Sequence, residues 1–452
     1  MDSGDVKGTE DGMQAIASVD AADPVALVDS RDARDGSEGE VEAGPARRSA
    51  SVDASDAAPT APPKARGGAR WVLLGPALLC GSLSLLMIGS EVGARSFVLG
   101  TVLAVLPVPF YVMLALWLDR FEAEPPGVLA QTFLWGAAVA VFIAMMINGY
   151  AESTLEAIAG TRASEVLGAV VSAPVVEEVA KGIALLFLYF EFDDEFDGVI
   201  DGVVYAAMVG LGFAMVENIQ YYGEALNEGT QSSLVTFMIR GMMGPFAHPF
   251  FTSMIGIGLG VAREGPPGGR RYLPPLLGLV AAISLHALWN LAASFDQYFV
   301  PAYLLVMVPA FFGVLALIYV SLRRESGVIR DHLAPLVDDG LLDPAELECL
   351  CRVRSRLRAT TDAWRAGGAE GWRLRRELHQ TASELAFHRW RVRRGITRGP
   401  HADAAREAAY RRRLAELCAH PWRVPARVDR GYADATDLAQ GDSDASASTP
   451  GG

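Results

Sequence analysis

Cysteine is scarce in this chain of 452 residues, which contains only four. Cys80 lies in an apolar run, and the other three lie in a polar region that we expect to be cytoplasmic, where disulfides are unlikely. Cys349 and Cys351 are separated by a single residue, and no second ligand pair follows them at the spacing of a zinc site. We therefore interpret the cysteines, including Cys418, as structural or inert thiols.

A cleavable signal peptide is also lacking, because the first 30 residues are acidic and contain no apolar core. The first membrane helix would then act as its own insertion signal. Residues 1–69 are rich in Asp, Ala, Ser and Gly and poor in bulky apolar side chains, and residues 433–452 have the same character. Such segments bury too little surface to fold. We predict a disordered acidic tail at 1–69 and a second disordered tail at 433–452.

Long apolar runs, by contrast, fill residues 70–322. A membrane-spanning helix needs about 20 mostly apolar residues. The stretches that meet this requirement are 71–90, 96–118, 128–149, 164–190, 198–222, 232–261, 273–294 and 300–322. We predict an all-α, polytopic membrane bundle of about eight helices, or of six or seven if a middle segment is re-entrant.

Basic residues are distributed unevenly between the two ends of these helices. With the N-terminus inside, the outer loops carry only Arg95 and Arg162. The inner flanks carry Lys64, Arg66, Arg70, Arg120, Arg263, Arg270, Arg271, Arg323 and Arg324. Because Lys and Arg accumulate on cytoplasmic flanks, we expect a multi-pass protein of the cell membrane with both termini in the cytoplasm.

Residues 323–432 are rich in arginine, and we predict that they form a small cytoplasmic helical region. Asp343 is a candidate N-cap for a run that Pro344 opens, and two further runs cover 371–394 and 402–418. The arginines would either attract anionic lipid head groups or form the solvated face of a helical bundle. No nucleic-acid-binding module accompanies this charge, so we expect no nucleic-acid partner.

The middle of the apolar run at 164–190 contains three ionisable residues within five positions. Glu177 and Glu178 lie four and three residues before Lys181, so the ammonium can reach either carboxylate along one helix. Each such residue costs at least ~2.5 kcal/mol at the bilayer centre. A structural lysine that neutralises one glutamate would leave the second unexplained. Two adjacent carboxylates with little solvation should not both ionise freely, so we expect one of them to have a raised pKa. A general acid or base needs such a pKa near neutral pH.

The next run contains Glu217 and Asn218, and Arg240 in the following run is the obvious ionic partner of Glu217. Upstream of Glu217, small residues recur every four positions, at Gly198, Gly202, Ala206, Gly210 and Ala214. This spacing lets a neighbouring helix approach closely, so we interpret the glycines as packing residues.

Two histidines also lie in apolar runs. His248 precedes Pro249, which bends a helix and frees a backbone carbonyl. His286 and Asn290 are four residues apart and share a helix face. They would either stabilise an oxyanion or form hydrogen bonds between helices, and His with Glu could also bind a divalent metal.

The ordered motifs Glu-Glu-x-x-Lys, Phe-x-x-x-Glu-Asn, His-Pro-Phe and His-x-x-Trp-Asn resemble those of the PrsW family of intramembrane proteases. That family is similar to a branch of the wider superfamily of CAAX-type prenyl proteases and bacteriocin-processing enzymes. The resemblance covers about residues 70–322 and has four motifs in order across successive helices. It implies site-1-type cleavage of a single-span, membrane-anchored protein, such as an anti-sigma factor.

The resemblance also implies roles for individual residues. Glu177 and Glu178 would be the base and its supporting acid, His286 and Asn290 would stabilise the oxyanion, and His248 would be a second site histidine. The supporting residues would be Lys181, Glu217, Asn218 and Arg240. A metal-free glutamate mechanism and a mechanism with a divalent metal such as zinc both fit these residues. For a metal, the candidate ligands are Glu178, His248 and His286.

Two other functions use the same residue types. A proton- or ion-coupled transporter would use buried Glu, Lys and His as a relay, but we find no internal inverted repeat of the kind common in transporters. A catalytically inactive scaffold that binds transmembrane helices would not need the complete set of acid, base and donor residues. Intramembrane peptide-bond hydrolysis is therefore the leading hypothesis.

Overall fold

The computed structural model describes residues 74–420, apart from Arg120, 122–123, 193–194, Pro245, 266–267 and 397–398 and the side chains of Asp296 and Gln297. The predicted tails at 1–69 and 433–452 lie outside the described residues, as do Lys64, Arg66, Arg70 and Arg120. All described residues belong to one compact unit, Ala57–Gly452. Every regular element in the described part of the chain is a helix, which confirms the all-α prediction.

Seven helical stretches within the described residues are long and apolar enough to cross a membrane. The first two are α1 (Leu74–Val92) and the pair α2 (Ala94–Val105) and α3 (Val108–Leu118). The third joins α4 (Pro126–Leu134), η2 (Trp135–Ala140) and α5 (Val141–Ala159).

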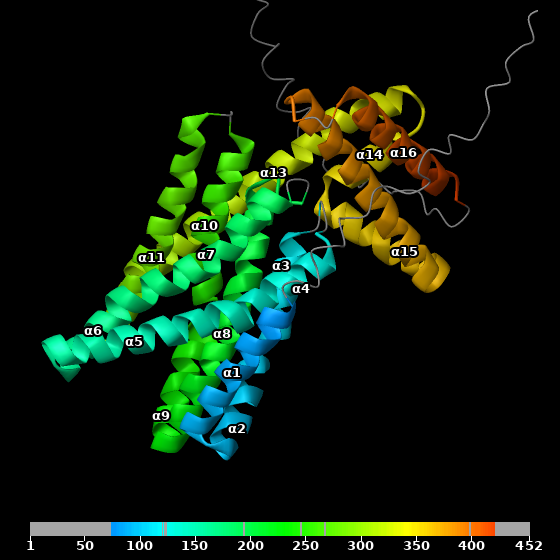
Figure 1. Cartoon of the computed structure of the whole chain (residues 1–452). Coiled ribbons are helices and arrows are strands. Elements are labelled where there is room, and N and C mark those ends of the chain that lie inside the picture. Colours follow the sequence, from blue (N-terminus) through cyan, green and yellow to red (C-terminus); the bar gives the residue numbers. More distant parts are fainter. Residues whose placement is uncertain are drawn as a thin grey trace, which may run out of the picture. The chain divides into compact units, whose positions relative to one another are not determined.

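The fourth stretch is α8 (Val199–Glu228), and the fifth joins α9 (Thr230–Thr236), η4 (Phe237–Met243) and α10 (Ala247–Glu264). The sixth is η5 (Gly269–Tyr272) with α11 (Leu273–Ala293). The seventh runs from Tyr298 to Asp338 through α12 (Asp296–Ala302), η6 (Tyr303–Met307) and α13 (Val308–Asp338). Figure 1 shows these helices as a bundle, without a sheet.

The predicted run at 164–190 is helical but is not one of the seven. It corresponds to α6 (Thr161–Leu167), η3 (Gly168–Ser172) and α7 (Ala173–Glu191). Its middle carries Glu177, Glu178 and Lys181, which lower its apolar character. Seven stretches of the described residues therefore meet the requirement on length and composition, which lies within the predicted range of six to eight. α7 is nevertheless packed within the bundle, against α5, α8, α10 and α11.

Helix α8 lies at the centre of the bundle, and 94% of the residues in its most apolar stretch are buried. Its small residues face α10: a Cβ added to Gly202 would lie 2.1 Å from the carbonyl oxygen of Gly256. A Cβ at Gly210 would lie 2.6 Å from the nitrogen of Pro249. The predicted close approach of a neighbouring helix is confirmed. On another face of α8, Gly136 of η2 meets the carbonyl oxygen of Val209.

Four of the helical stretches contain a π-helical turn, in which hydrogen bonds join residues five apart. These turns are η2, η3, η4 and η6. Two of them adjoin the polar residues singled out in the sequence. η3 leads directly into α7, and η4 carries Arg240.

The arginine-rich region forms α14 (Pro344–Cys351), α15 (Val353–Arg393) and α16 (Pro400–Ala419). The predicted N-cap is confirmed, because an Asp343 carboxylate oxygen accepts from the backbone N–H of Ala345 at 2.8 Å. The run after Pro344 ends at Cys351, because Arg352 has an extended conformation. α15 is itself interrupted at Gly368, whose φ is 58°.

Arg356 and Arg391 of the arginine-rich region are buried, so these two belong neither to a lipid-binding surface nor to a solvated face. Arg356 donates to the carbonyl oxygen of Leu350 at 2.7 Å and to the hydroxyl of Ser383 at 2.8 Å. Arg391 forms an ion pair with Asp197, which precedes α8. The Arg391–Asp197 pair attaches α15 to the start of α8, whereas the contacts of Arg356 join α15 to α14 and to its own second half.

Candidate active site

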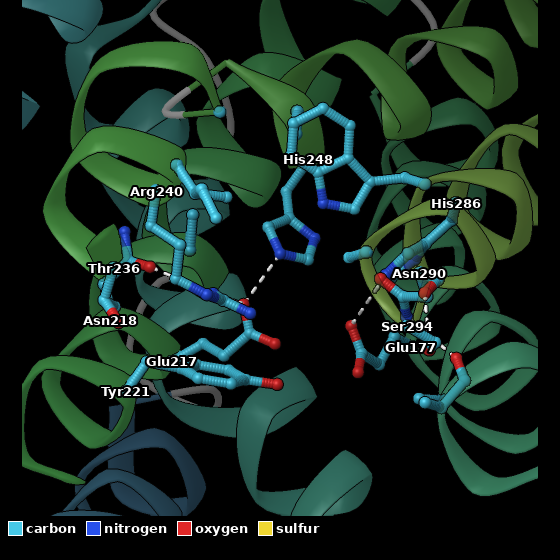
Figure 2. Close-up of a pocket in the computed structure, with 18 residues that line it drawn as sticks. Glu177, Glu217, Asn218, Tyr221, Thr236, Arg240, His248, His286, Asn290 and Ser294 are labelled. Atoms are coloured by element: carbon cyan, nitrogen blue, oxygen red, sulfur yellow. Dashed lines mark hydrogen bonds and ion pairs between the residues drawn. The ribbon is translucent and has the colours of Figure 1, made fainter. Parts of the chain in front are cut away.

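Four helical stretches bring the polar residues of the membrane region together. α7 supplies Glu177, Glu178 and Lys181, and α8 supplies Glu217 and Asn218. Arg240 comes from η4, His248 from α10, and His286 and Asn290 from α11. Figure 2 shows His248 between the Glu217–Arg240 pair on one side and Glu177 and Asn290 on the other. All nine residues predicted from the sequence therefore lie in one neighbourhood.

Lys181 connects both glutamates to a histidine. Its side chain is fully buried, and its ammonium lies 2.8 Å from Glu178 Oε1 and 3.4 Å from Glu177 Oε2. The predicted reach to both carboxylates is confirmed. The same Nζ atom lies 2.9 Å from Nδ1 of His248 and 3.9 Å from the centre of the Phe213 ring. A buried ammonium without partners would be costly, and these contacts with two carboxylates, a histidine and an aromatic ring offset the cost of its desolvation.

Glu178 is fully buried, and three donors surround its carboxylate. Oε1 accepts from Lys181 and lies 3.1 Å from Nδ1 of His286, while Oε2 accepts from the hydroxyl of Thr252 at 2.9 Å. Because an ionised carboxylate is acceptor-only, Nδ1 of His286 carries the hydrogen. The lone pair of His286 is then on Nε2, which lies 3.9 Å from Glu177 Oε2. Glu178 thus fixes the tautomer and orientation of His286.

His248 is fixed from both sides. Its Nδ1 accepts from the Lys181 ammonium, which has no acceptor capacity, so its Nε2 donates to Glu217 Oε2 at 2.7 Å. Glu217 also pairs with Arg240 at 2.9 Å, which confirms the predicted partner. Arg240 donates in addition to Oδ1 of Asn218 at 3.0 Å.

Asn290 and His286 do not share an acceptor. The amide of Asn290 donates to the carbonyl oxygen of Ala169 in η3 at 2.8 Å, whereas His286 contacts Glu178. Asn290 thus forms an interhelical hydrogen bond with one of its two amide hydrogens. It joins α11 to the segment that leads into α7.

A cavity of about 330 Å³ opens beside these side chains. Glu177, Glu217, Arg240, His248, His286 and Asn290 all line it. A second cavity of about 620 Å³ shares Ala169, Ala173, Glu177, Glu217 and Tyr221 with the first. Glu177 therefore lies where the two cavities meet, although only 5% of the residue is exposed.

Glu177, His248 and His286 are placed so that they could hold a metal ion. Each offers one ligand atom, and these atoms lie within 4.8 Å of one another. Two histidines and one glutamate form a known ligand set of catalytic zinc. The Nε2 lone pair of His286 and its Nδ1 hydrogen bond to Glu178 match the usual second-shell arrangement. The residue types therefore fit a divalent metal, with Glu177 in place of the expected Glu178. Both ring nitrogens of His248 are already used, by Lys181 and Glu217, so a bound metal would have to replace one of these two contacts.

A second group, Glu346, Cys349 and His379, has comparable spacing in the arginine-rich region. There the guanidinium of Arg375 pairs with both Glu346 oxygens, at 2.6 and 3.0 Å, and lies 3.3 Å from the Cys349 sulfur. Burial raises the pKa of the Cys349 thiol. This group therefore already contains a cation and a protonated thiol.

Sequence reasoning missed three residues that contact the site. Thr252 lies four residues after His248, and Tyr221 lies four residues after Glu217, so helical spacing alone could have indicated both. The guanidinium of Arg240 lies 3.2 Å from the centre of the Tyr221 ring. Trp135 donates to the carbonyl oxygen of Ala180 at 3.0 Å, a contact between distant segments that has no sequence signal.

Comparisons with known proteins relate the chain to one family of membrane proteases. A family model described as "PrsW family intramembrane metalloprotease" matches residues 124–314. The "Protease PrsW" of Bacillus subtilis (strain 168) is 30% identical over 173 residues, which cover 38% of this chain and 72% of that protein. The "Protease PrsW" of Geobacillus kaustophilus (strain HTA426) is 34% identical over 155 residues, which cover 34% of this chain and 63% of that protein.

A third "Protease PrsW", from Oceanobacillus iheyensis, is 28% identical over 116 residues, or 26% of this chain. The chain thus spans 63% and 49% of the lengths of the Geobacillus and Oceanobacillus relatives. No solved structure matches it. The matched residues 124–314 contain every one of the nine predicted site residues. The chain belongs to the PrsW family.

Proposed function

We propose that this protein is an intramembrane endopeptidase that hydrolyses a peptide bond of a membrane-anchored protein. One observation carries the proposal: a buried carboxylate, Glu177, lies at the junction of two cavities and next to the Nε2 atom of His286. Hydrolysis needs a group that accepts a proton from water beside the scissile bond. The cavities provide room for water and for an extended peptide segment next to that group.

The two glutamates have different proposed roles because their surroundings differ. Both oxygens of Glu178 accept hydrogen bonds, so it serves as the supporting group that orients His286. Glu177 lines both cavities, and we assign it the proton transfer, from water to the leaving amine. Lys181 holds the two carboxylates and His248 in register.

Asn290 is the proposed oxyanion donor. Its amide has two hydrogens, of which one donates to Ala169, and the residue lines the smaller cavity. In the tautomer inferred from its contact with Glu178, His286 has an acceptor rather than a donor on Nε2, so we do not assign it a hydrogen bond to the oxyanion. A divalent metal such as zinc would be held by Glu177, His248 and His286 and would supply a Lewis acid beside these residues.

We further propose that α6, η3 and α7 cross the membrane as an eighth span. They run without a break from Thr161 to Glu191, about 45 Å at 1.5 Å per residue. Both termini would then lie on one side of the membrane. The excess of Lys and Arg at the inner helix flanks makes this the cytoplasmic side. The cavities would lie toward the other side, because Glu91, Glu152 and Glu224 of the larger cavity are near the helix ends that Arg95 and Arg162 flank. This placement supports site-1-type cleavage.

The test is Glu177→Gln, which keeps the size of the side chain and removes its basicity. Cleavage of single-span reporters with an epitope at each end, including a single-span anti-sigma factor, should fall about 100-fold or more. The matched control is Glu156→Gln, because Glu156 is exposed and lines neither cavity. Full cleavage by Glu177→Gln protein that is normally inserted would refute the proposal.

A further inference from the structure

The larger cavity has a composition that the proposed chemistry does not explain. It lies between α1 and α8 on one side and α5 and α6 on the other, and has a volume of about 620 Å³. Its deep part is apolar, with Ile88, Val141, Ala144 and Met145. Its outer part carries carboxylates from four helices: Glu91, Glu152, Glu165 and Glu224. No lysine or arginine is among its described lining residues.

The outer carboxylates are accessible to a ligand. Glu91, Glu152 and Glu165 are exposed, and Glu224 is half-buried. Among the described residues, Gln220 donates a side-chain hydrogen bond to Glu224 at 2.9 Å, and the other three carboxylates form no side-chain hydrogen bond. Arg95 and Arg162, the basic residues of the neighbouring loops, do not line the cavity. The negative charge at this opening is therefore not neutralised by the cavity's own walls.

The cavity is continuous with the catalytic neighbourhood. Ala169, Ala173, Glu177, Glu217 and Tyr221 line it as well as the smaller cavity. A segment that occupies the larger cavity would therefore lie beside Glu177. The distance between the outer glutamates and the catalytic neighbourhood suits a short peptide, because Glu217 and Glu224 are two turns apart on α8, about 10 Å.

We propose that this cavity is the docking site of the substrate, and that it selects a membrane-spanning segment flanked by lysine or arginine. The apolar part would hold the end of the substrate's span, and the four carboxylates would hold its basic flank. Basic flanks are uncommon on the outer side of membrane helices, so this preference would discriminate among single-span proteins. The inference rests on the proposed function and names the substrate class of that site.

The test measures binding without cleavage, in a Glu177→Gln background reconstituted in phosphatidylcholine vesicles. The probes are fluorescent peptides with a span of 20 Leu and Ala residues, flanked by three Lys, three Ser or three Glu. Energy transfer from the protein should show about five- to tenfold tighter binding of the Lys-flanked peptide than of the Ser-flanked peptide. Salt should reduce this difference.

Matched variants locate the effect. Replacing Glu91, Glu152, Glu165 and Glu224 together by Gln should abolish the preference for the Lys flank. Replacing Glu156 and Glu228 should preserve it, because both are exposed on α5 and α8 but line neither cavity. Equal affinity for all three peptides, or an unchanged preference in the fourfold variant, would overturn the proposal. Cleavage by the unmodified protein is scored separately, so failure of docking and failure of the protease function give different results.

Discussion

Thr252 is the least conspicuous residue of the site and has a well-defined contact. It is fully buried, and its hydroxyl donates to Glu178 Oε2 at 2.9 Å. Glu178 in turn holds Nδ1 of His286. Loss of the hydroxyl would leave a buried carboxylate oxygen without a donor and would loosen the orientation of His286.

We therefore expect Thr252→Val, which keeps the shape of the side chain, to lower kcat for reporter cleavage about tenfold. Thr252→Ser, which restores the hydroxyl, should recover most of the rate. Equal activities of the Val and Ser variants would show that Thr252 acts only through packing.

Asp119 permits a prediction of pH dependence outside the membrane-spanning segments. Burial raises its pKa to about 8, against a hydrogen bond from the backbone N–H of Glu124 that lowers it. The folded state therefore holds a proton that the unfolded state releases near pH 4. Protonated Asp119 therefore contributes fully to the free energy of unfolding below about pH 4, and this contribution is lost as the pH rises toward 8.

Asp119→Asn keeps an acceptor for Glu124 and cannot ionise. We expect its thermal midpoint in detergent to exceed that of the unmodified protein by about 2–4 °C at pH 8. At pH 4 the two midpoints should coincide. A variant that is less stable at both values would contradict this assignment.

At this scale the sequence predicted the charged residues well, because an ionisable side chain in an apolar run is conspicuous. Glu217 and Arg240 were paired correctly on charge alone. Hydrogen-bond directions were less predictable. Asn290 donates to a backbone carbonyl on another segment, and backbone acceptors carry no signal in the sequence.

Among the elements, the contact of α8 with α10 determines the geometry of the site. The distance between them sets the 2.7 Å contact of Glu217 with His248. At Gly202, a Cβ would lie 2.1 Å from a backbone oxygen of α10, which cannot move independently of its helix. Gly202→Ala would therefore push the two helices apart.

We expect Gly202→Ala to lower the thermal midpoint and to reduce cleavage in parallel. Gly313→Ala is the matched control, because Gly313 is also helical and nothing lies within 4 Å of a Cβ added there. Intrinsic helix propensity predicts unchanged or slightly higher stability for the control. Similar behaviour of the two variants would show that the α8–α10 contact is not tight.

Hydropathy predicted the helices and their order but not their interruptions. The run after Pro344 ends at Cys351 because Arg352 is extended, and no proline or glycine marks that position. For the run at 164–190, the helix was predicted correctly, and it is the membrane crossing that hydropathy leaves open. Its helix is present, but hydropathy alone does not decide whether a helix with three ionisable residues crosses the membrane.

For the molecule as a whole, the described contacts join the arginine-rich helices to the membrane bundle. Arg391 of α15 pairs with Asp197, and the side chains are 10% and 9% exposed. Arg356 donates to the carbonyl oxygen of Phe121 at 3.3 Å, which adds an attachment to the segment between α3 and α4. Such contacts join distant segments, and composition alone could not predict them.

Arg391→Met should leave Asp197 buried without its partner, at a cost of about 3–5 kcal/mol. We expect faster hydrogen exchange and faster proteolysis in α15 and α16. Adding Asp197→Asn should restore much of the protection. If the double variant exchanges as fast as the single one, the pair contributes nothing specific to docking.

The π-helical turns have a consequence for how this family can vary. A π turn contains one residue more than the α-helical turn it replaces, and it persists when surrounding contacts compensate its cost. η3 lies immediately before the helix that carries Glu177. Deletion of one residue from Gly168–Ser172 would restore regular pitch and rotate the preceding helix by about 100° relative to α7. Relatives that lack this turn should therefore show a one-residue gap at this point, and length variation elsewhere in the span should be rare.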